Sequence, residues 1–290
     1  KTGKKKIVVA GIFAALAMVN GVQDSQAING SGARTGWNSN GVGFNPTQGL
    51  VVGPNMNDNT TIANGNVATV AIGAHSQASG SSSVAIGGAE VNGAGAVGLG
   101  WATAKGDNSV ALGGTGSTNA NGNNTFAASG GSATGNGAIA IGWQTNAKND
   151  ATAVGSNAQA TDKDSVAVGK NSNAAGESAT AVGSSATASG RGGVAVGWNA
   201  ESAVNAVGVG FNAKAKANNT VAIGVEANND NAIDKNYSSV SIGVKTRARA
   251  VGSMAMGVSA DASGKYSIAL GSGDVVNDYT NGTNYPKATG

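Results

Sequence analysis

The side chains that most often carry out chemistry are scarce in this chain of 290 residues, which has one histidine, His75, and no cysteine. A histidine can act as the base of an acyl-transfer site, but no carboxylate stands next to His75 in the sequence to orient its ring. Without cysteine there is neither a disulfide framework nor a thiolate metal site, and the calcium-binding G-G-x-G-x-D repeat is missing. The sequence therefore predicts no catalytic residue, no metal and no cofactor, and His75 is interpreted as a solvated turn residue.

Four aromatic side chains are better candidates for a binding role, because each directly follows a glycine in the same local pattern. Aromatic residues that recur at one position of a repeat can form an exposed ladder that contacts a ligand or a surface. They can also shield a bend of the chain or lean across an interface between subunits. Both interpretations stay open for the candidate contact residues Trp101, Trp143, Trp198 and Phe211.

The pattern that positions these residues is a short repeat, an apolar–Ala–apolar–Gly tetrad such as Val166-Ala167-Val168-Gly169. Internal repeats of fixed period are the signature of solenoid architectures. The tetrads end at the glycines Gly73, Gly87, Gly100, Gly113, Gly142, Gly155, Gly169, Gly183, Gly197, Gly210, Gly224, Gly243, Gly257 and Gly271.

Successive tetrad glycines are 13 or 14 residues apart, with two exceptions. The interval of 29 residues hides a worn copy, Phe126-Ala127-Ala128-Ser129, which brings the number of copies to fifteen. The interval of 19 residues predicts an insertion of about five residues near 228–237. We expect this insertion to project from one coil, where it could make contacts.

Each repeat contains two short alternating segments, which is typical of β-strands. In the tetrad, the first and third residues are large and apolar and the second is nearly always Ala. The next segment alternates small and polar residues, as in Ala158-Gln159-Ala160. Two strands and two tight turns fit into fourteen residues, so the sequence predicts an all-β, two-walled parallel β-roll. The large tetrad residues are expected to face the core, and the glycine to bend the chain with a positive φ or a close approach.

On that assignment, the alanine of each tetrad lies on the side away from the core. A flat stripe of alanine exposed to water invites association, and burying it against identical chains removes that exposure. The sequence thus predicts a parallel homo-oligomer whose symmetry axis lies near the alanines Ala71, Ala85, Ala111, Ala167, Ala181, Ala195 and Ala222.

The basic charge of the chain belongs to its first residues. Four lysines precede an apolar run at 7–19, and Ser25-Gln26-Ala27 follows, which is the pattern of a signal peptide at 1–27. Residues 28–290 hold 14 basic and 14 acidic residues, so no basic surface favours nucleic acid. In the repeats, Glu226 is expected to stack on Lys245, and Asp230 to lie between Lys216 and Arg249, mainly setting register.

The repeats resemble those of the YadA-like head family of trimeric autotransporter adhesins. The resemblance covers residues 67–271 and rests on motifs such as Ser83-Val84-Ala85-Ile86-Gly87 and Ser165-Val166-Ala167-Val168-Gly169. It implies a left-handed parallel β-roll that forms a homotrimer on the surface of a Gram-negative cell. The resemblance also implies an outer-membrane anchor in a C-terminal part that this sequence does not show. The flanking segments are interpreted as an N-terminal cap at 28–66 and an irregular segment at 272–290.

The function expected from this resemblance is non-enzymatic adhesion to host matrix proteins, other cells or abiotic surfaces, with roles in virulence and biofilms. A structural spacer within a longer fibre is the main alternative. An ice-binding roll is less favoured, because the outward positions mix Gln, Lys, Asn, Asp and Glu instead of regular Thr. A left-handed-helix acyltransferase is also less favoured, because its hexapeptide coils have about eighteen residues.

Overall fold

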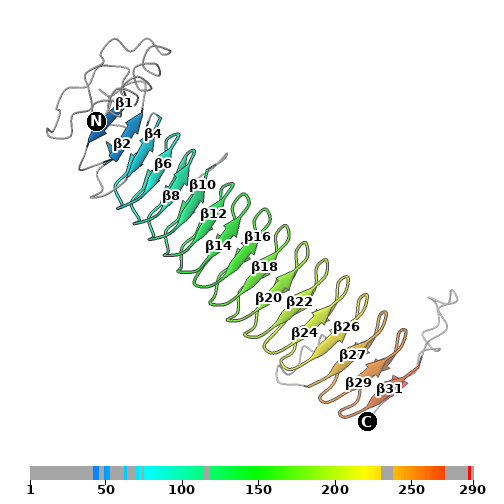
Figure 1. Ribbon diagram of the computed structural model, residues 1–290. Coiled ribbons are helices and arrows are strands. Elements are labelled where there is room, and N and C mark those ends of the chain that lie inside the picture. Colours follow the sequence, from blue (N-terminus) through cyan, green and yellow to red (C-terminus); the bar gives the residue numbers. More distant parts are fainter. Residues whose placement is uncertain are drawn as a thin grey trace, which may run out of the picture.

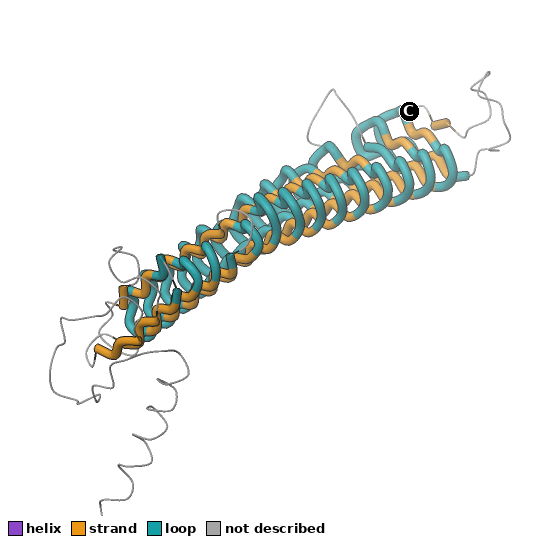
Figure 2. The backbone as a smooth tube through the Cα atoms, turned by 90° about the horizontal axis from the view of Figure 1, so that it is seen from above, coloured by secondary structure: helices purple, strands orange, loops and turns teal. Residues whose placement is uncertain are grey.

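The computed structural model of the protein describes residues 69–73, 75–113, 118–229 and 238–271, and the backbone of strands at 42–45, 49–52, 62–63 and 287–288. These residues contain strands and turns and no helix. Figure 1 shows the strands stacked one after another along a rod, and Figure 2 shows that the chain winds around the rod's axis. The predicted all-β parallel roll is confirmed. Nothing in the described ranges is a helix long and apolar enough to span a membrane.

One wall of the rod, called here the tetrad wall, is built from the repeated tetrads. Neighbouring strands pair in parallel and in register, so that Ala167 lies opposite Ala181 and Val168 opposite Val182. The worn copy at Phe126–Ala128 forms a regular strand of this wall. The strands are β4 (Val70–Ile72), β6 (Val84–Ile86), β8 (Val97–Leu99), β10 (Val110–Leu112), β12 (Phe126–Ala128), β14 (Ile139–Ile141), β16 (Thr152–Val154), β18 (Val166–Val168), β20 (Thr180–Val182), β22 (Val194–Val196), β24 (Val207–Val209), β26 (Val221–Ile223), β27 (Val240–Ile242), β29 (Met254–Met256) and β31 (Ile268–Leu270).

The opposite wall, called the second wall, carries the segments that alternate small and polar residues. Its strands also pair in parallel. Where the predicted insertion begins, two isolated bridges join Asn228 to Lys214 on one side and to Arg247 on the other. Residues 230–237 of that insertion lie outside the described residues. The strands are β5 (Gln77–Ala78), β7 (Glu90–Val91), β9 (Ala102–Ala104), β11 (Thr118–Ala120), β13 (Ser132–Ala133), β15 (Asn146–Ala147), β17 (Gln159–Ala160), β19 (Asn173–Ala174), β21 (Thr187–Ala188), β23 (Glu201–Ser202), β25 (Lys214–Ala215), β28 (Arg247–Ala248) and β30 (Asp261–Ala262).

Both walls extend beyond the repeats that the sequence revealed. Strand β2 (Gly49–Val52) pairs in parallel with β4, and β3 (Ile62–Ala63) pairs with β5, so rungs of both walls lie within the region predicted as a cap. Strand β1 (Val42–Asn45) pairs antiparallel with β2 at that end. At the other end, β32 (Lys287–Ala288) pairs in parallel with β30. The signal peptide predicted at 1–27 lies outside the described residues.

The core between the walls consists of small side chains, and this corrects the predicted orientation of the tetrads. The core-facing alanines of both walls are at most 4% exposed in the single chain, most of them 0%, and the large tetrad residues face outward. The walls are so close that only Ala, Ser, Thr or Gly fits between them at most positions. The predicted stripe at the symmetry axis is therefore wrong, because the core of each chain encloses Ala71, Ala85, Ala111, Ala167, Ala181, Ala195 and Ala222.

The bends that join the walls follow two rules. A positive φ occurs at all the tetrad glycines except Gly113, and Ser129 of the worn copy adopts φ +54° in the glycine position. Serine and threonine hydroxyls donate to the carbonyl three residues earlier, as from Ser172 Oγ to Gly169 O at 2.9 Å and from Ser165 Oγ to Asp162 O at 2.6 Å. These bonds satisfy hydroxyl groups that the core would otherwise bury without a partner.

One coil shows how tightly the two walls fit. Gly98 replaces the usual core alanine of its tetrad, and Val91, on the second wall, is the largest fully buried side chain in the described core. A methyl group added at Gly98 would lie 2.6 Å from Val91 Cγ2. The larger residue on one wall therefore fills the space left by the smaller residue on the other.

We expect Gly98→Ala to destabilise the roll by about 1–3 kcal/mol through overpacking, and Val91→Ala to destabilise it through the cavity it leaves. The double variant should be more stable than the sum of the two single destabilisations predicts, with a coupling free energy of about 1 kcal/mol or more in urea denaturation. Gly98→Ala combined with the distant Ala174→Gly is the control, and those effects should add. Additive effects for the Gly98–Val91 pair would contradict the packing described.

Candidate functional site

The outward side of the tetrad wall is a continuous apolar face, formed by the first and third residues of the tetrads. In mid-rod these side chains are partly covered by the coils on either side, so that Ile223 is 38% exposed. Ile268 and Leu270, in β31 at the end of the described tetrad wall, are 58% and 63% exposed. An apolar face that runs the length of the rod is larger than soluble monomers normally expose, and it marks an interaction surface.

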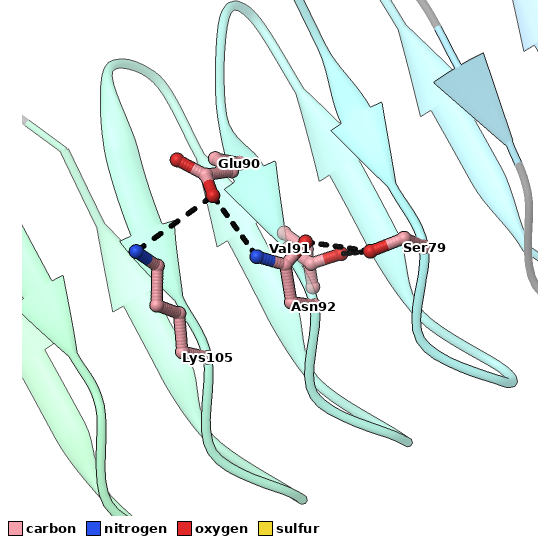
Figure 3. A network of polar contacts seen from close by, with 5 residues as sticks. All are labelled: Ser79, Glu90, Val91, Asn92 and Lys105. Atoms are coloured by element: carbon pink, nitrogen blue, oxygen red, sulfur yellow. Dashed lines mark hydrogen bonds and ion pairs between the residues drawn. The ribbon is translucent and has the colours of Figure 1, made fainter.

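The outward side of the second wall is polar. In Figure 3, Lys105 Nζ lies 3.8 Å from Glu90 Oε1, which also accepts a hydrogen bond from Asn92 Nδ2 at 2.9 Å. Ser79 Oγ then donates to Asn92 Oδ1 at 2.5 Å, so one chain of polar contacts crosses three coils. The two walls therefore present opposite chemistry to their surroundings, apolar on one side and hydrogen-bonding on the other.

The ion pairs of the later coils differ from those predicted. Lys216 Nζ lies 3.1 Å from Glu201 Oε2, and Arg249 Nη2 lies 2.6 Å from Asp261 Oδ2. Glu226 and Lys245 occupy the same turn position in successive coils, but no ion pair joins them. Asp230 lies outside the described residues. Exposed pairs of this kind contribute about 0–1 kcal/mol each, so they adjust register more than stability.

The four candidate aromatic residues all lie at the bend after a tetrad glycine, and they are 48–67% exposed in the single chain. The structure brings two of them together, because the rings of Trp198 and Phe211 stack with centroids 4.8 Å apart. Trp101 lies over Gly88, with its ring 5.6 Å from that of His75. Trp143 stands apart from the other three.

Two further residues continue the Trp198–Phe211 column, and the sequence interpretation missed them. Val225 and Val244 are exposed at the same bend position in the next two coils. Backbone bonds of 2.8 Å hold the column in register, from Glu226 N to Phe211 O and from Lys245 N to Val225 O. Each valine follows a tetrad glycine, so its position could have been predicted from the sequence. The sequence interpretation considered only aromatic residues at this position.

His75 lies exposed in a turn with φ +63°, as interpreted from the sequence. Among the described residues, no three His, Cys, Asp or Glu side chains gather in a group that could hold a metal ion.

The sequence model of one protein family, described as the YadA head domain repeat, matches most of the rod. The matches cover residues 62–89, 92–115, 133–150, 147–172, 174–200, 202–233 and 248–273.

The chain belongs to the YadA head family.

The unmatched stretches of this YadA head between 115 and 133 and between 233 and 248 contain the worn copy and the end of the insertion, yet regular strands β12 and β27 continue the roll there. Heads of this family are parts of trimeric autotransporter adhesins, which form homotrimers, bind extracellular targets and are exposed at the cell surface. Their fold is that of non-enzymatic adhesins. No curated protein matches the chain at a significant level.

Proposed function

We propose that this YadA head works as a homotrimer that attaches its cell to host matrix proteins, other cells or abiotic surfaces. The observation that supports the proposal is the apolar face along the tetrad wall, opposite the polar second wall. Three parallel chains that turn their tetrad walls inward bury the apolar residues around a common axis. The same arrangement turns three polar second walls outward, toward whatever the fibre meets.

Attachment by such a surface relies on number rather than on one deep site. The second wall repeats a similar polar coil along the rod, and a trimer displays it three times. Many weak contacts that act together give an avidity far above that of any one contact. In this proposal, the segment at 1–27 directs export, and the head is held at the outer membrane by an anchor of the kind found in its family.

Beads coated with the chain provide a direct test of adhesion. They should adhere under flow to at least one of four surfaces: collagen, fibronectin, bare polystyrene or a layer of the same chain. Matched beads that carry a chain unable to trimerise should be retained much less, because avidity is lost with the trimer. If the trimeric chain adheres to none of these surfaces, the result favours the alternative role, a spacer within a longer fibre.

Trp101 and Trp143 are the aromatic residues that we propose as ligand contacts. Each is exposed without an aromatic neighbour stacked on it in the next coil. Trp143→Ala should weaken adhesion about tenfold, since truncating a good aromatic contact costs about 1–2 kcal/mol. Ser156→Ala, one coil further at the same bend position, is the control. Unchanged adhesion by Trp143→Ala would favour the other interpretation, in which the ring shields the bend.

A further inference from the structure

Each coil has two edges, one at each bend, and backbone hydrogen bonds define a column of residues along each of them. The leading edge contains the residue after each tetrad glycine, from Trp143 through Lys170 and Trp198 to Val244. The trailing edge runs along the other bend. Its carbonyls accept N–H groups from the next coil, as from Ser178 N to Lys163 O at 2.9 Å and from Asn219 N to Val204 O at 2.9 Å.

In some coils the two edges carry residues that suit each other. In the coils that begin at Val166 and Thr180, Lys170 lies on the leading edge opposite Glu177 on the trailing edge, and Ser184 opposite Arg191. In two of the later coils, those that begin at Val194 and Val240, both edges are apolar, whereas Phe211 shares its coil with the polar Asn218. Trp198 shares its coil with the exposed Val204, and Val244 shares its coil with Val251.

A chain cannot join its own two edges, because they lie at opposite ends of a flattened coil, as the loops on both sides of the strands in Figure 1 show. In a ring of identical copies, the contact is heterologous, so the leading edge of one copy meets the trailing edge of the next. Parallel copies at equal height bring together edges of the same coil. Lys170 then meets a carboxylate, and Trp198 meets an apolar side chain.

We infer that the leading edge of each copy packs against the trailing edge of the next copy, which rests on the proposed homotrimer. Trp198 covers Val204 of the neighbouring copy, and Lys170 pairs with Glu177 of that copy. Within its own chain, Glu177 Oε2 already lies 3.3 Å from Arg191 Nε, so Lys170 of the other copy adds a second cation to that pair. Trp198 is thus a subunit contact, while Trp143, whose coil carries the polar Asn149 at its trailing edge, stays available to a ligand.

Disulfide cross-linking tests this pairing directly, because the chain has no cysteine of its own. The variant Lys170→Cys with Glu177→Cys places one thiol on each edge of the same coil. Oxidation should close a covalent ring, seen as a band of three chain masses on a non-reducing gel, because a disulfide forms only when the Cα atoms lie within about 7 Å. Each single variant should stay at one chain mass, as should Lys170→Cys with Asn173→Cys, whose second thiol lies on the second wall.

Sedimentation of the same samples before oxidation separates the possible failures. If the sample sediments at three chain masses but does not cross-link on oxidation, the edge pairing is overturned and the trimer stays in place. If it sediments at one chain mass, the trimer itself is overturned. A covalent product that stops at two chains contradicts a heterologous ring. Ser184→Cys with Arg191→Cys repeats the test one coil further along, so that a folding defect in the first variant does not decide the result.

Discussion

Replacing Ile223 with glutamate is expected to convert the trimeric head into folded single chains. Ile223 points outward from the tetrad wall, so its replacement leaves the alanine core untouched. In the trimer, three carboxylates would be buried around one axis without partners. An uncompensated buried charge costs about 3–5 kcal/mol, and here each copy carries one. Sedimentation should therefore show one chain mass, while far-UV circular dichroism keeps its β spectrum.

Thr187→Glu is the matched control, because Thr187 faces outward from the second wall and its replacement places the same charge on the polar side. This variant should stay trimeric and keep the same β spectrum. If Ile223→Glu also remained trimeric, the apolar face would not be the surface that joins the copies.

Gly169→Ala is expected to destabilise the roll more than the alanine replacements at Gly98 and Gly87. Gly169 has φ +130°, a conformation that side chains other than glycine rarely adopt. A Cβ atom there would lie 2.5 Å from Gly183 O, and that backbone cannot move without opening the stack of coils. Backbone strain costs about 1–3 kcal/mol, and the steric clash adds to it, so the loss should exceed about 3 kcal/mol.

Gly87→Ala gives the comparison that isolates the clash. Gly87 has φ +72°, and an added Cβ atom would lie 3.6 Å from the next glycine, which is an ordinary contact. Its cost should be confined to the strain of the positive φ, so thermal melting should fall by much less than for Gly169→Ala. Equal losses at the two sites would mean that the close backbone approach at Gly169 does not limit stability.

The periodicity of the sequence was enough to predict the coils, their two strands and their bends. Alternation with period two shows that a tetrad has two faces, but it does not say which face is inside. The assumption that Val168 is buried and Ala167 exposed follows the usual rule for a single sheet. It fails in a roll whose second wall contributes mostly small residues such as Ala174, because two such walls lie too close for valine at most positions. The small residues of the second segment in each repeat already indicated that the space between the walls is narrow.

Other features lay beyond the pattern that was searched. The strand at Gly49–Val52 has valine where the tetrads have alanine, and it lies farther from the next tetrad than one period, so it was interpreted as part of a cap. The stacking of Trp198 on Phe211 depends on side-chain orientation at the bend, which spacing alone does not give. Which residues lie at the two edges of one coil becomes visible only once the coil is known to be flat.

The mass of the unmodified chain in solution tests most directly whether three copies bury their tetrad walls against one another. Sedimentation equilibrium over a wide range of concentration should give three chain masses, with no smaller species except at high dilution. A chain that is folded, as judged by circular dichroism, and that sediments at one chain mass throughout would contradict the arrangement. Its apolar face would then be free, and both the subunit contacts and the avidity argued for this head would lose their basis.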